Sequence, residues 1–124
     1  MQIEIDIESA TPIFTQLITQ IKNAVVNGNI SPGSPLPSIR QLANDLEVNN
    51  KTVAKAYRLL ERDSVIQSKG YRGSFIHPEA LTNSTVDLNQ WVEKTLTKVI
   101  NDFKKAGVTD SEIRIAFNQI LKNK

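Results

Sequence analysis

The stretch LPSIRQLANDLEVNNKTVAKAYRLLERD, residues 36–63, decides the fold of this chain. Ser38 followed three positions later by Gln41 is a capping box, which is typical of the first turn of a helix. Asn49 can cap a further helix that runs to about Asp63, because an asparagine side chain accepts hydrogen bonds from the free amides at a helix start. Two short helices joined by a tight turn indicate a helix-turn-helix, although an ordinary helical hairpin has the same spacing.

The second of these helices has two chemically different faces. Apolar residues recur on one face at helical spacing: Val53, Ala56, Tyr57 and Leu60. Basic residues cluster nearly opposite: Lys51, Lys55, Arg58 and Arg62. A helix that docks on its core by one face can place cations on the other against DNA phosphates, whereas a merely solvated face would show the same pattern. Glu61 and Asp63 disfavour deep insertion of the helix end, so we expect DNA contacts in its first two turns.

A basic hairpin is predicted directly after this helix. Residues 65–68 (VIQS) and 74–77 (SFIH) are short β-prone runs, and between them lies KGYRG, residues 69–73. The two glycines in this tip allow a close approach to another backbone. A helix-turn-helix followed by a basic hairpin is the layout of a winged helix. Tyr57 and Phe75 are expected in its core rather than stacked on bases.

The residues before the helix-turn-helix complete a small domain. Residues 3–8 (IEIDIE) alternate apolar and acidic side chains, a pattern typical of a half-buried strand. A helix with an apolar stripe follows, and glycine 28 ends it. The prolines within residues 32–37 then exclude a helix and predict a stiff connection.

Two further helices are predicted in the last third of the chain, after a polar linker over residues 78–86. We expect a winged helix-turn-helix domain with an extended N-terminal segment over residues 1–77 and a two-helix dimerisation hairpin over residues 87–124. The fold class is thus mainly α with a small β-wing. The alternative to dimerisation is packing of the hairpin back onto residues 12–77. The predicted dimer interface consists of Leu88, Trp91, Val92, Leu96, Val99, Phe103, Ile113, Phe117 and Ile120.

Composition removes several classes of function. The 124 residues include no cysteine and one histidine, so thiolate zinc sites, iron–sulfur clusters and multi-histidine metal sites are excluded. Hydrophobic residues make up 40% of the chain, which argues against wholesale disorder. The net charge of +2 is concentrated in residues 38–77, where seven bases stand against four acids. This local excess favours a polyanionic partner, and the chain is expected to be a cytoplasmic binding protein with no membrane span.

Three strings carry a resemblance to a known family. They are PIFTQL at residues 12–17, GNISPG at residues 28–33 and LPSIRQLA at residues 36–43, and the match continues to residue 76. On these residues the chain resembles the GntR family of bacterial transcription regulators. The short remainder is similar to the YtrA-type subfamily, in which two helices replace a large ligand-binding domain. The resemblance implies a homodimeric repressor that binds a palindromic operator.

The resemblance also implies roles for single residues. Arg40 matches the family arginine that contacts operator DNA from the helix before the recognition helix, and Thr52 matches a phosphate- or base-contacting threonine. Gly70 matches the wing-tip glycine that enters the minor groove. The sequence departs from the family at residues 49–51, which read NNK where many members read Ser-Arg-Thr. An arginine suited to reading guanine is therefore absent.

The candidate DNA-binding residues divide by chemistry. Cations neutralise phosphates, so we expect Lys51, Lys55, Lys69 and Arg72 mainly on the DNA backbone. Arginine and asparagine can read guanine and adenine edges, so Arg40, Asn49 and Asn50 are the candidates for base contacts. For each residue, exposure without contact is the alternative. The predicted DNA-binding set is Ser38, Arg40, Asn49, Asn50, Lys51, Thr52, Lys55, Lys69, Gly70 and Arg72.

Two other functions are alternatives to a DNA-binding repressor. A winged helix can serve as a protein-interaction module without operator-specific binding, and loss of salt-dependent DNA binding would favour that function. An enzyme is not expected, because the sequence shows no nucleophile–base pair, metal cluster or phosphate loop. No cofactor is predicted, and the sequence does not identify a small-molecule effector.

Overall fold

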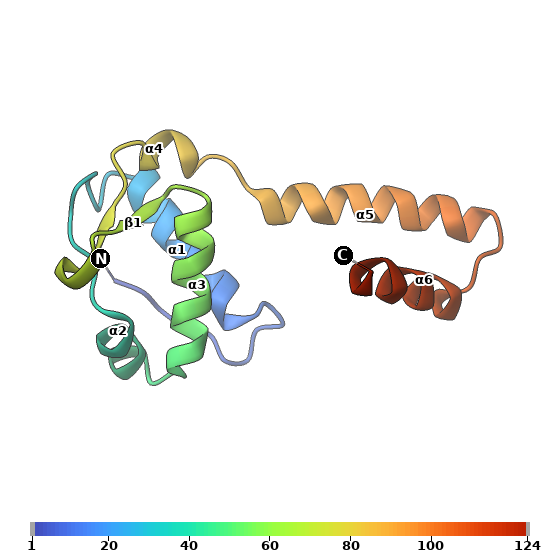
Figure 1. The fold of residues 1–124 in the computed structure, drawn as a ribbon, viewed down its shortest axis with the longest axis horizontal. Coiled ribbons are helices and arrows are strands. Elements are labelled where there is room, and N and C mark those ends of the chain that lie inside the picture. Colours follow the sequence, from blue (N-terminus) through green and yellow to red (C-terminus); the bar gives the residue numbers. More distant parts are fainter. Residues whose placement is uncertain (1, 124) are drawn as a thin grey trace. The chain divides into compact units, whose positions relative to one another are not determined.

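The computed structural model describes residues 2–123, and the chain divides into two compact units, Met1–Val86 and Asp87–Lys124 (Figure 1). The first unit contains α1 (Ile13–Val26), α2 (Ile39–Leu46), α3 (Asn50–Arg62), β1 (Ile66–Ser68), the short 3-10 helix η1 (Gly70–Arg72), β2 (Ser74–Ile76) and α4 (Ala80–Asn83). The second unit contains α5 (Leu88–Lys105) and α6 (Asp110–Lys122). The predicted fold class is confirmed: a mainly helical chain with a winged helix-turn-helix, a two-stranded wing and two C-terminal helices.

The core of the first unit lies where α3 packs against both α1 and α2. Its largest fully buried side chains come from α1, α3 and the base of the wing. They are Leu17, Ile21, Val53, Leu60, Val65 and Ile76. Each lies in a stretch of sequence with helical or strand-like apolar spacing. Burial of these faces holds α3 with its opposite face towards solvent.

Both predicted N-caps of the helix-turn-helix form, but α2 has only half of the predicted capping box, because the described residues show no bond from the Ser38 amide to the Gln41 side chain. The Ser38 hydroxyl accepts a hydrogen bond from the Gln41 amide at 3.1 Å, and Asn49 Oδ1 accepts one from the Lys51 amide at 2.8 Å. Between the two helices, Glu47 ends α2 in the left-handed conformation with φ 57°. Glycine is the usual residue in this position, because a side chain strains the backbone there.

Replacing Glu47 with glycine is expected to raise the free energy of unfolding by about 1 kcal/mol, because glycine relieves this strain. For a unit of this size the melting temperature would rise by about 5 °C. Thermal unfolding followed by circular dichroism measures the effect. The control is Asp45→Gly, which removes a carboxylate two residues earlier but inside α2, where glycine destabilises a helix by about 1 kcal/mol. A lower melting temperature for both variants would contradict the assignment of strain to residue 47.

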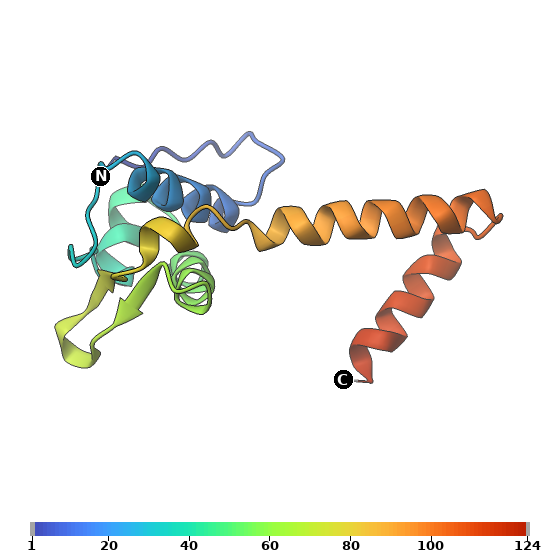
Figure 2. The same cartoon turned by 90° about the horizontal axis from the view of Figure 1, so that it is seen from above.

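The wing is an antiparallel hairpin in which Ile66 pairs with Ile76 and Ser68 with Ser74. Its tip closes through a hydrogen bond from the Lys69 amide to the Gly73 carbonyl at 2.8 Å. Gly73 adopts φ +100°, a backbone conformation that favours glycine. The proline-rich connection borders β2, since the Leu36 amide donates to the Ser74 carbonyl at 2.9 Å. The hairpin predicted from the sequence is therefore confirmed, with η1 at its tip (Figure 2).

Residues 3–8 do not form the strand that their alternation predicts. Ile3 and Ile5 do pack against the core, but two glutamine side chains of α1 take the place of a neighbouring strand. Gln20 accepts from the Glu4 amide at 2.9 Å and donates to the Glu4 carbonyl at 2.6 Å. Gln16 makes the same pair of bonds with Asp6, at 2.9 and 3.0 Å. The backbone groups of Glu4 and Asp6 are thus satisfied by side-chain amides rather than by a neighbouring strand.

Residues 78–86 also differ from the expected polar linker. They contain α4, which packs against α1, and Ala80 is fully buried. The side-chain amide of Asn83 donates to the Ser64 carbonyl at 2.9 Å, which ties this segment to the turn after α3. The segment is thus part of the first unit rather than a free connector.

The second unit is a hairpin of α5 and α6 with no buried side chain in either helix. Thr109 and Glu112 form a capping box at the start of α6, and an ion pair of 3.3 Å joins Lys104 to Asp110. Between the helices runs an apolar groove of about 670 Å³. Among the described residues, no helix is long and apolar enough to cross a membrane.

Candidate DNA-binding surface

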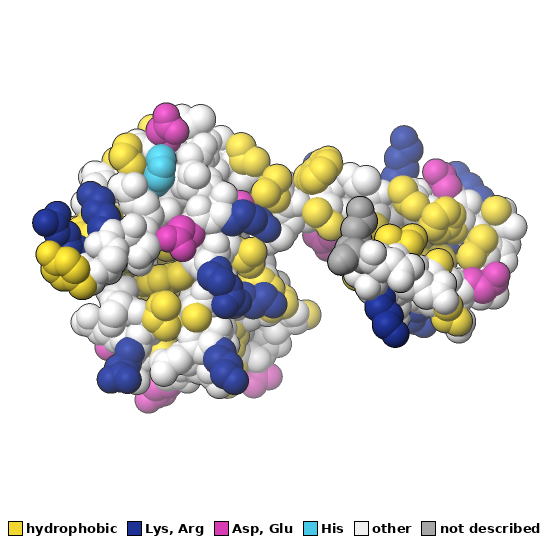
Figure 3. Space-filling view, viewed as in Figure 1, with side chains coloured by type: hydrophobic (Ala, Val, Ile, Leu, Met, Phe, Trp, Pro, Cys, Tyr) yellow, Lys and Arg dark blue, Asp and Glu magenta, His cyan; other side chains and the backbone are white. Residues whose placement is uncertain are grey.

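Helix α3 presents its predicted basic face to solvent. Lys51, Lys55, Arg58 and Arg62 are all exposed, whereas the apolar residues opposite them are buried. Thr52 lies at the edge of this face and is half-buried. In the space-filling view, Lys and Arg side chains are spread over α3, over the wing and around the helix-turn-helix (Figure 3). The structure thus brings the predicted cations onto one face of the first unit.

The start of α3 carries two asparagines with different capacities. Asn49 Oδ1 accepts the Lys51 amide in the cap, which ties this oxygen to the start of the helix and leaves the amide group as the freer part of the side chain for a hydrogen bond to DNA. Asn50 is exposed, and its side chain makes no hydrogen bond within residues 2–123. A bidentate contact with adenine requires one donor and one acceptor on the same side chain. Of the two residues, Asn50 is therefore the one equipped for it.

Tyr57 positions α2 relative to α3. Its hydroxyl donates to the Pro37 carbonyl at 2.8 Å, directly before the Ser38 cap. Burial raises the pKa of Tyr57 to about 12, so the hydroxyl keeps its proton and the hydrogen bond. Ser38 and Arg40 are exposed at the start of α2, beside the point that Tyr57 holds. Tyr57 lies in the core, as predicted, and is not available for stacking on bases.

Aromatic rings orient two of the candidate lysines. Lys55 Nζ lies 4.0 Å from the centroid of the Phe14 ring in α1, and Lys69 Nζ lies 5.0 Å from that of Phe75 in the wing. An ammonium over a ring face is attracted by about 0.5–1 kcal/mol at exposed sites. Local sequence patterns could not reveal this role of Phe14, because its contact with Lys55 joins two different helices, α1 and α3. Phe14 restricts the Lys55 side chain and so reduces the entropy that a phosphate contact would cost.

The wing tip carries three of the predicted residues and one that the sequence analysis missed. Lys69, Gly70 and Arg72 are exposed at the tip. Tyr71 lies between them in η1 and is 96% exposed. The sequence could have predicted that Tyr71 is exposed, because it lies between two glycines in a basic hairpin tip. An aromatic side chain at such a tip is too far from the core to be buried. A tyrosine ring at this point can pack on the sugars that line a DNA groove.

The C-terminal end of α3 is less available to DNA than its start. Arg62 Nε donates to Asp63 Oδ1 at 2.8 Å, and this hydrogen bond raises the pKa of the arginine. The charge of Arg62 is thus partly neutralised by its neighbour. This agrees with the expectation that contacts concentrate in the first two turns.

Among residues 2–123, no three His, Cys, Asp or Glu side chains are placed to hold a metal ion together. The single histidine, His77, accepts a hydrogen bond at Nδ1 from the Glu79 amide at 3.0 Å. This hydrogen bond stabilises the turn before α4 and does not involve the basic residues of α3.

Residues 14–76, from the start of α1 to the end of the wing, match the family model described as Bacterial regulatory proteins, gntR family. The chain belongs to the GntR family. The resemblance drawn from its sequence motifs is therefore confirmed, and the helix-turn-helix is the DNA-binding module of a GntR-family transcriptional regulator, not part of an enzyme.

Relatives extend the similarity beyond the first unit. The HTH-type transcriptional repressor YtrA of Bacillus subtilis (strain 168) is 39% identical over 106 residues, which cover 86% of this chain and 82% of the relative. Among solved structures, YtrA of Sulfolobus acidocaldarius, a GntR-family transcription factor, is 30% identical with a TM-score of 0.58. That match covers 98% of this chain and 97% of the other.

A transcriptional regulator from Oenococcus oeni gives a similar result. It is 33% identical with a TM-score of 0.60, and the match covers 94% of this chain and 97% of the other. The GntR fold with only two C-terminal helices is thus shared along nearly the whole chain.

Proposed function

We propose that this GntR-family regulator is a repressor that binds a palindromic operator as a homodimer in the cytoplasm. The observation that carries the proposal is the start of α3, where exposed amide and ammonium groups project from a helix whose other face is buried. Such a helix can lie in the major groove with its first turns on the base edges. The similarity to the repressor YtrA of Bacillus subtilis, which is 39% identical, supports repression rather than activation of transcription.

The contacts divide between the two grooves and the backbone. Arg40 and Asn50 are assigned to base edges, and Asn49 to a single donated hydrogen bond. The exposed cations Lys51, Lys55, Lys69 and Arg72 are assigned to phosphates, which supply affinity but little sequence information. The wing tip with Gly70 and Tyr71 is assigned to the adjacent minor groove, where a glycine allows close approach.

The apolar groove of the second unit supports a homodimer. Six of the predicted interface residues line the groove: Leu96, Val99, Phe103, Ile113, Phe117 and Ile120. The other three lie outside it on α5, and of these Trp91 and Val92 are exposed while Leu88 is half-buried. A hairpin of two helices with no buried side chain gains little hydrophobic stabilisation alone. A second copy of the same hairpin would cover both apolar stripes in an isologous interface.

Dimerisation also suits operator recognition. A single recognition helix with its wing offers few base contacts, and single modules bury only about 600–1,000 Å² of protein surface on DNA. Two such modules related by a two-fold axis would read two half-sites about one helical turn apart. The symmetry of the protein would then be the reason for a palindrome.

Arg40→Ala and Lys51→Ala are each expected to weaken operator binding by about ten-fold or more, because each removes a base or phosphate contact from both half-sites of a dimer. Footprinting on the DNA upstream of the protein's own gene would define the operator, and fluorescence anisotropy would give the affinities. Circular dichroism would show that both variants remain folded.

The control for these variants is Lys94→Ala, which removes an exposed cation from α5 in the second unit. Its operator affinity should stay within two-fold of the unchanged protein's. Unchanged binding of both Arg40→Ala and Lys51→Ala would refute the assigned contacts. Binding with no preference for any DNA sequence would instead favour a protein-interaction module.

A further inference from the structure

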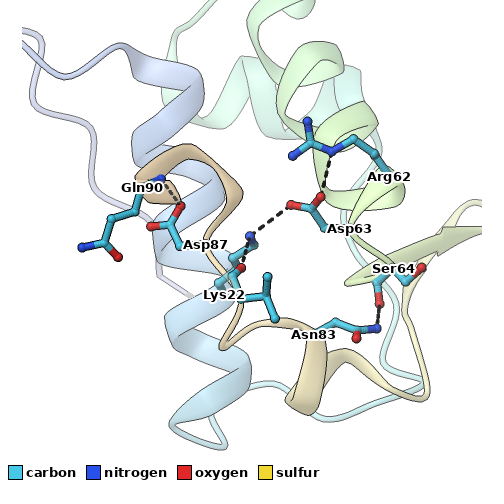
Figure 4. A network of polar contacts seen from close by, with 8 residues as sticks. Lys22, Arg62, Asp63, Ser64, Asn83, Asp87 and Gln90 are labelled. Carbon is cyan, nitrogen blue, oxygen red and sulfur yellow. Dashed lines mark hydrogen bonds and ion pairs between the residues drawn. The ribbon is translucent and has the colours of Figure 1, made fainter. Parts of the chain in front are cut away.

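The structure contains a buried ion pair that the DNA contacts do not use. Lys22 of α1 is only 8% exposed, and its Nζ lies 3.1 Å from Asp63 Oδ2, directly after α3 (Figure 4). Burial by itself raises the pKa of the Asp63 carboxyl. Hydrogen bonds and charge from Arg62 and Lys22 outweigh that effect, so the pKa lies below its usual range. Asp63 is therefore held as a carboxylate, and Lys22 is its buried partner.

The same ammonium group holds the end of the first unit. Lys22 Nζ donates a second hydrogen bond, of 3.1 Å, to the carbonyl of Val86, the last residue of that unit. The next residue, Asp87, caps α5 by accepting from the Gln90 amide at 3.0 Å. One buried side chain thus joins the end of the recognition helix to the point where the chain leaves for the second unit.

A second contact fixes the same segment independently. Asn83 donates to the Ser64 carbonyl in the turn after α3, and Ala80 is fully buried in α4. The segment from residue 80 to residue 86 is therefore held at three points: by burial of Ala80, by the Asn83 bond to the turn after α3, and by the Lys22 bond to Val86. An apolar residue in place of Lys22 could fill the same space, but it could not hold a backbone carbonyl. This difference separates a positioning role from simple core packing.

We propose that Lys22 and Asp63 are positioning residues that set which half-site spacing the dimer accepts. The inference rests on the proposed binding of a palindromic operator by a homodimer. If the chain leaves the end of each α3 at a fixed point and in a fixed direction, the two winged helix-turn-helix units of the dimer fit one spacing of half-sites. If that exit were loose, the residues before α5 would act as a flexible tether, and the dimer would tolerate several spacings.

The test uses the full-length double variant Lys22→Met/Asp63→Asn, which removes both charges without leaving a buried carboxylate unpaired. Operator duplexes carry the two half-sites at the natural spacing or moved by one or two base pairs in either direction. A further duplex carries one half-site only. Anisotropy gives a dissociation constant for each duplex, and thermal unfolding by circular dichroism checks that the variant is folded.

We expect a two-base-pair change of spacing to weaken binding of the unchanged protein by about 100-fold, because only one winged helix-turn-helix unit can then engage. For the double variant the same change should weaken binding by less than about ten-fold. Affinity for the single half-site should stay within two-fold. Asn83→Ala, which removes only the bond to Ser64, should flatten the spacing profile in the same direction and remains informative if the double variant unfolds.

The control variant is Lys104→Met/Asp110→Asn, which removes the exposed ion pair of the second unit by the same two substitutions. It should keep the spacing profile of the unchanged protein. An unaltered profile in folded Lys22→Met/Asp63→Asn overturns the proposal, and so does an equal loss of affinity on every duplex, which would mark a structural role alone. If the unchanged protein binds one half-site as tightly as the full operator, the proposed dimeric function fails as well.

Discussion

Phe117→Asp is expected to dissociate the homodimer and to weaken operator binding by about a thousand-fold, because the two half-sites would then be bound separately. Phe117 lines the apolar groove between α5 and α6 and is 45% exposed in the single chain. In the proposed dimer its ring is covered by the partner copy. An aspartate there would place an unpaired carboxylate in an apolar interface, which costs several kcal/mol.

Sedimentation at micromolar protein concentration measures the first part of this prediction, and anisotropy on the full operator measures the second. The matched control is Ile115→Asp, the same kind of change on the same helix. Ile115 is 59% exposed and does not line the groove. It should leave both mass and affinity nearly unchanged. Dissociation by Ile115→Asp but not by Phe117→Asp would place the interface on another face of α6.

The helix-turn-helix could be predicted from the sequence because each of its signals is local. The Ser38 and Asn49 caps form with amides two or three residues away, and the apolar and basic faces of α3 follow from helical periodicity alone. The exposure of the basic face could be predicted for the same reason, whereas its contact with DNA stays a prediction. When one face of a helix is buried, the side chains on the opposite face must be exposed to solvent.

The errors arose where a residue's role depends on a partner far away in the chain. Alternation in residues 3–8 predicts which side chains face the core. It cannot predict that the side chains of Gln16 and Gln20 form the hydrogen bonds to the backbone of this segment. Helix α4 has only four residues, and of its two apolar ones Ala80 is buried while Leu81 is exposed, so no periodic pattern could predict its packing.

Lys22 is the clearest case of a role hidden from local analysis. It is the one lysine or arginine among the first 37 residues, and no motif around it predicts a partner. Its partners, Asp63 and Val86, lie 41 and 64 positions further along the chain. The end of α3 can be explained in the same way, because glycine is the residue that commonly ends a helix and residues 63 and 64 are not glycine. Asp63 pairs with Lys22, while Ser64 takes the left-handed conformation with φ 57°.

Ionic strength is expected to change operator affinity more than any single substitution. Each protomer offers four cations for phosphates, Lys51, Lys55, Lys69 and Arg72, and a dimer offers twice that number. Release of the corresponding counterions predicts a slope of about −7 for the logarithm of affinity against that of salt concentration. Raising salt from about 50 to about 200 mM should therefore weaken binding by about 10⁴-fold. Anisotropy titrations on the footprinted operator measure the slope.

Replacing one basic residue at a time with alanine shows which residues contribute to this salt dependence. Lys69→Ala removes one wing cation from each protomer, so the slope should become less steep by about two, and affinity should fall similarly on all sequences. Lys94→Ala removes a cation of the second unit and should leave the slope as it was. If Lys94→Ala changes the slope as much as Lys69→Ala does, the phosphate contacts are not confined to the first unit. A slope near zero would mean that α3 and the wing do not lie on the DNA backbone, because their exposed cations could not be near phosphates without displacing counterions.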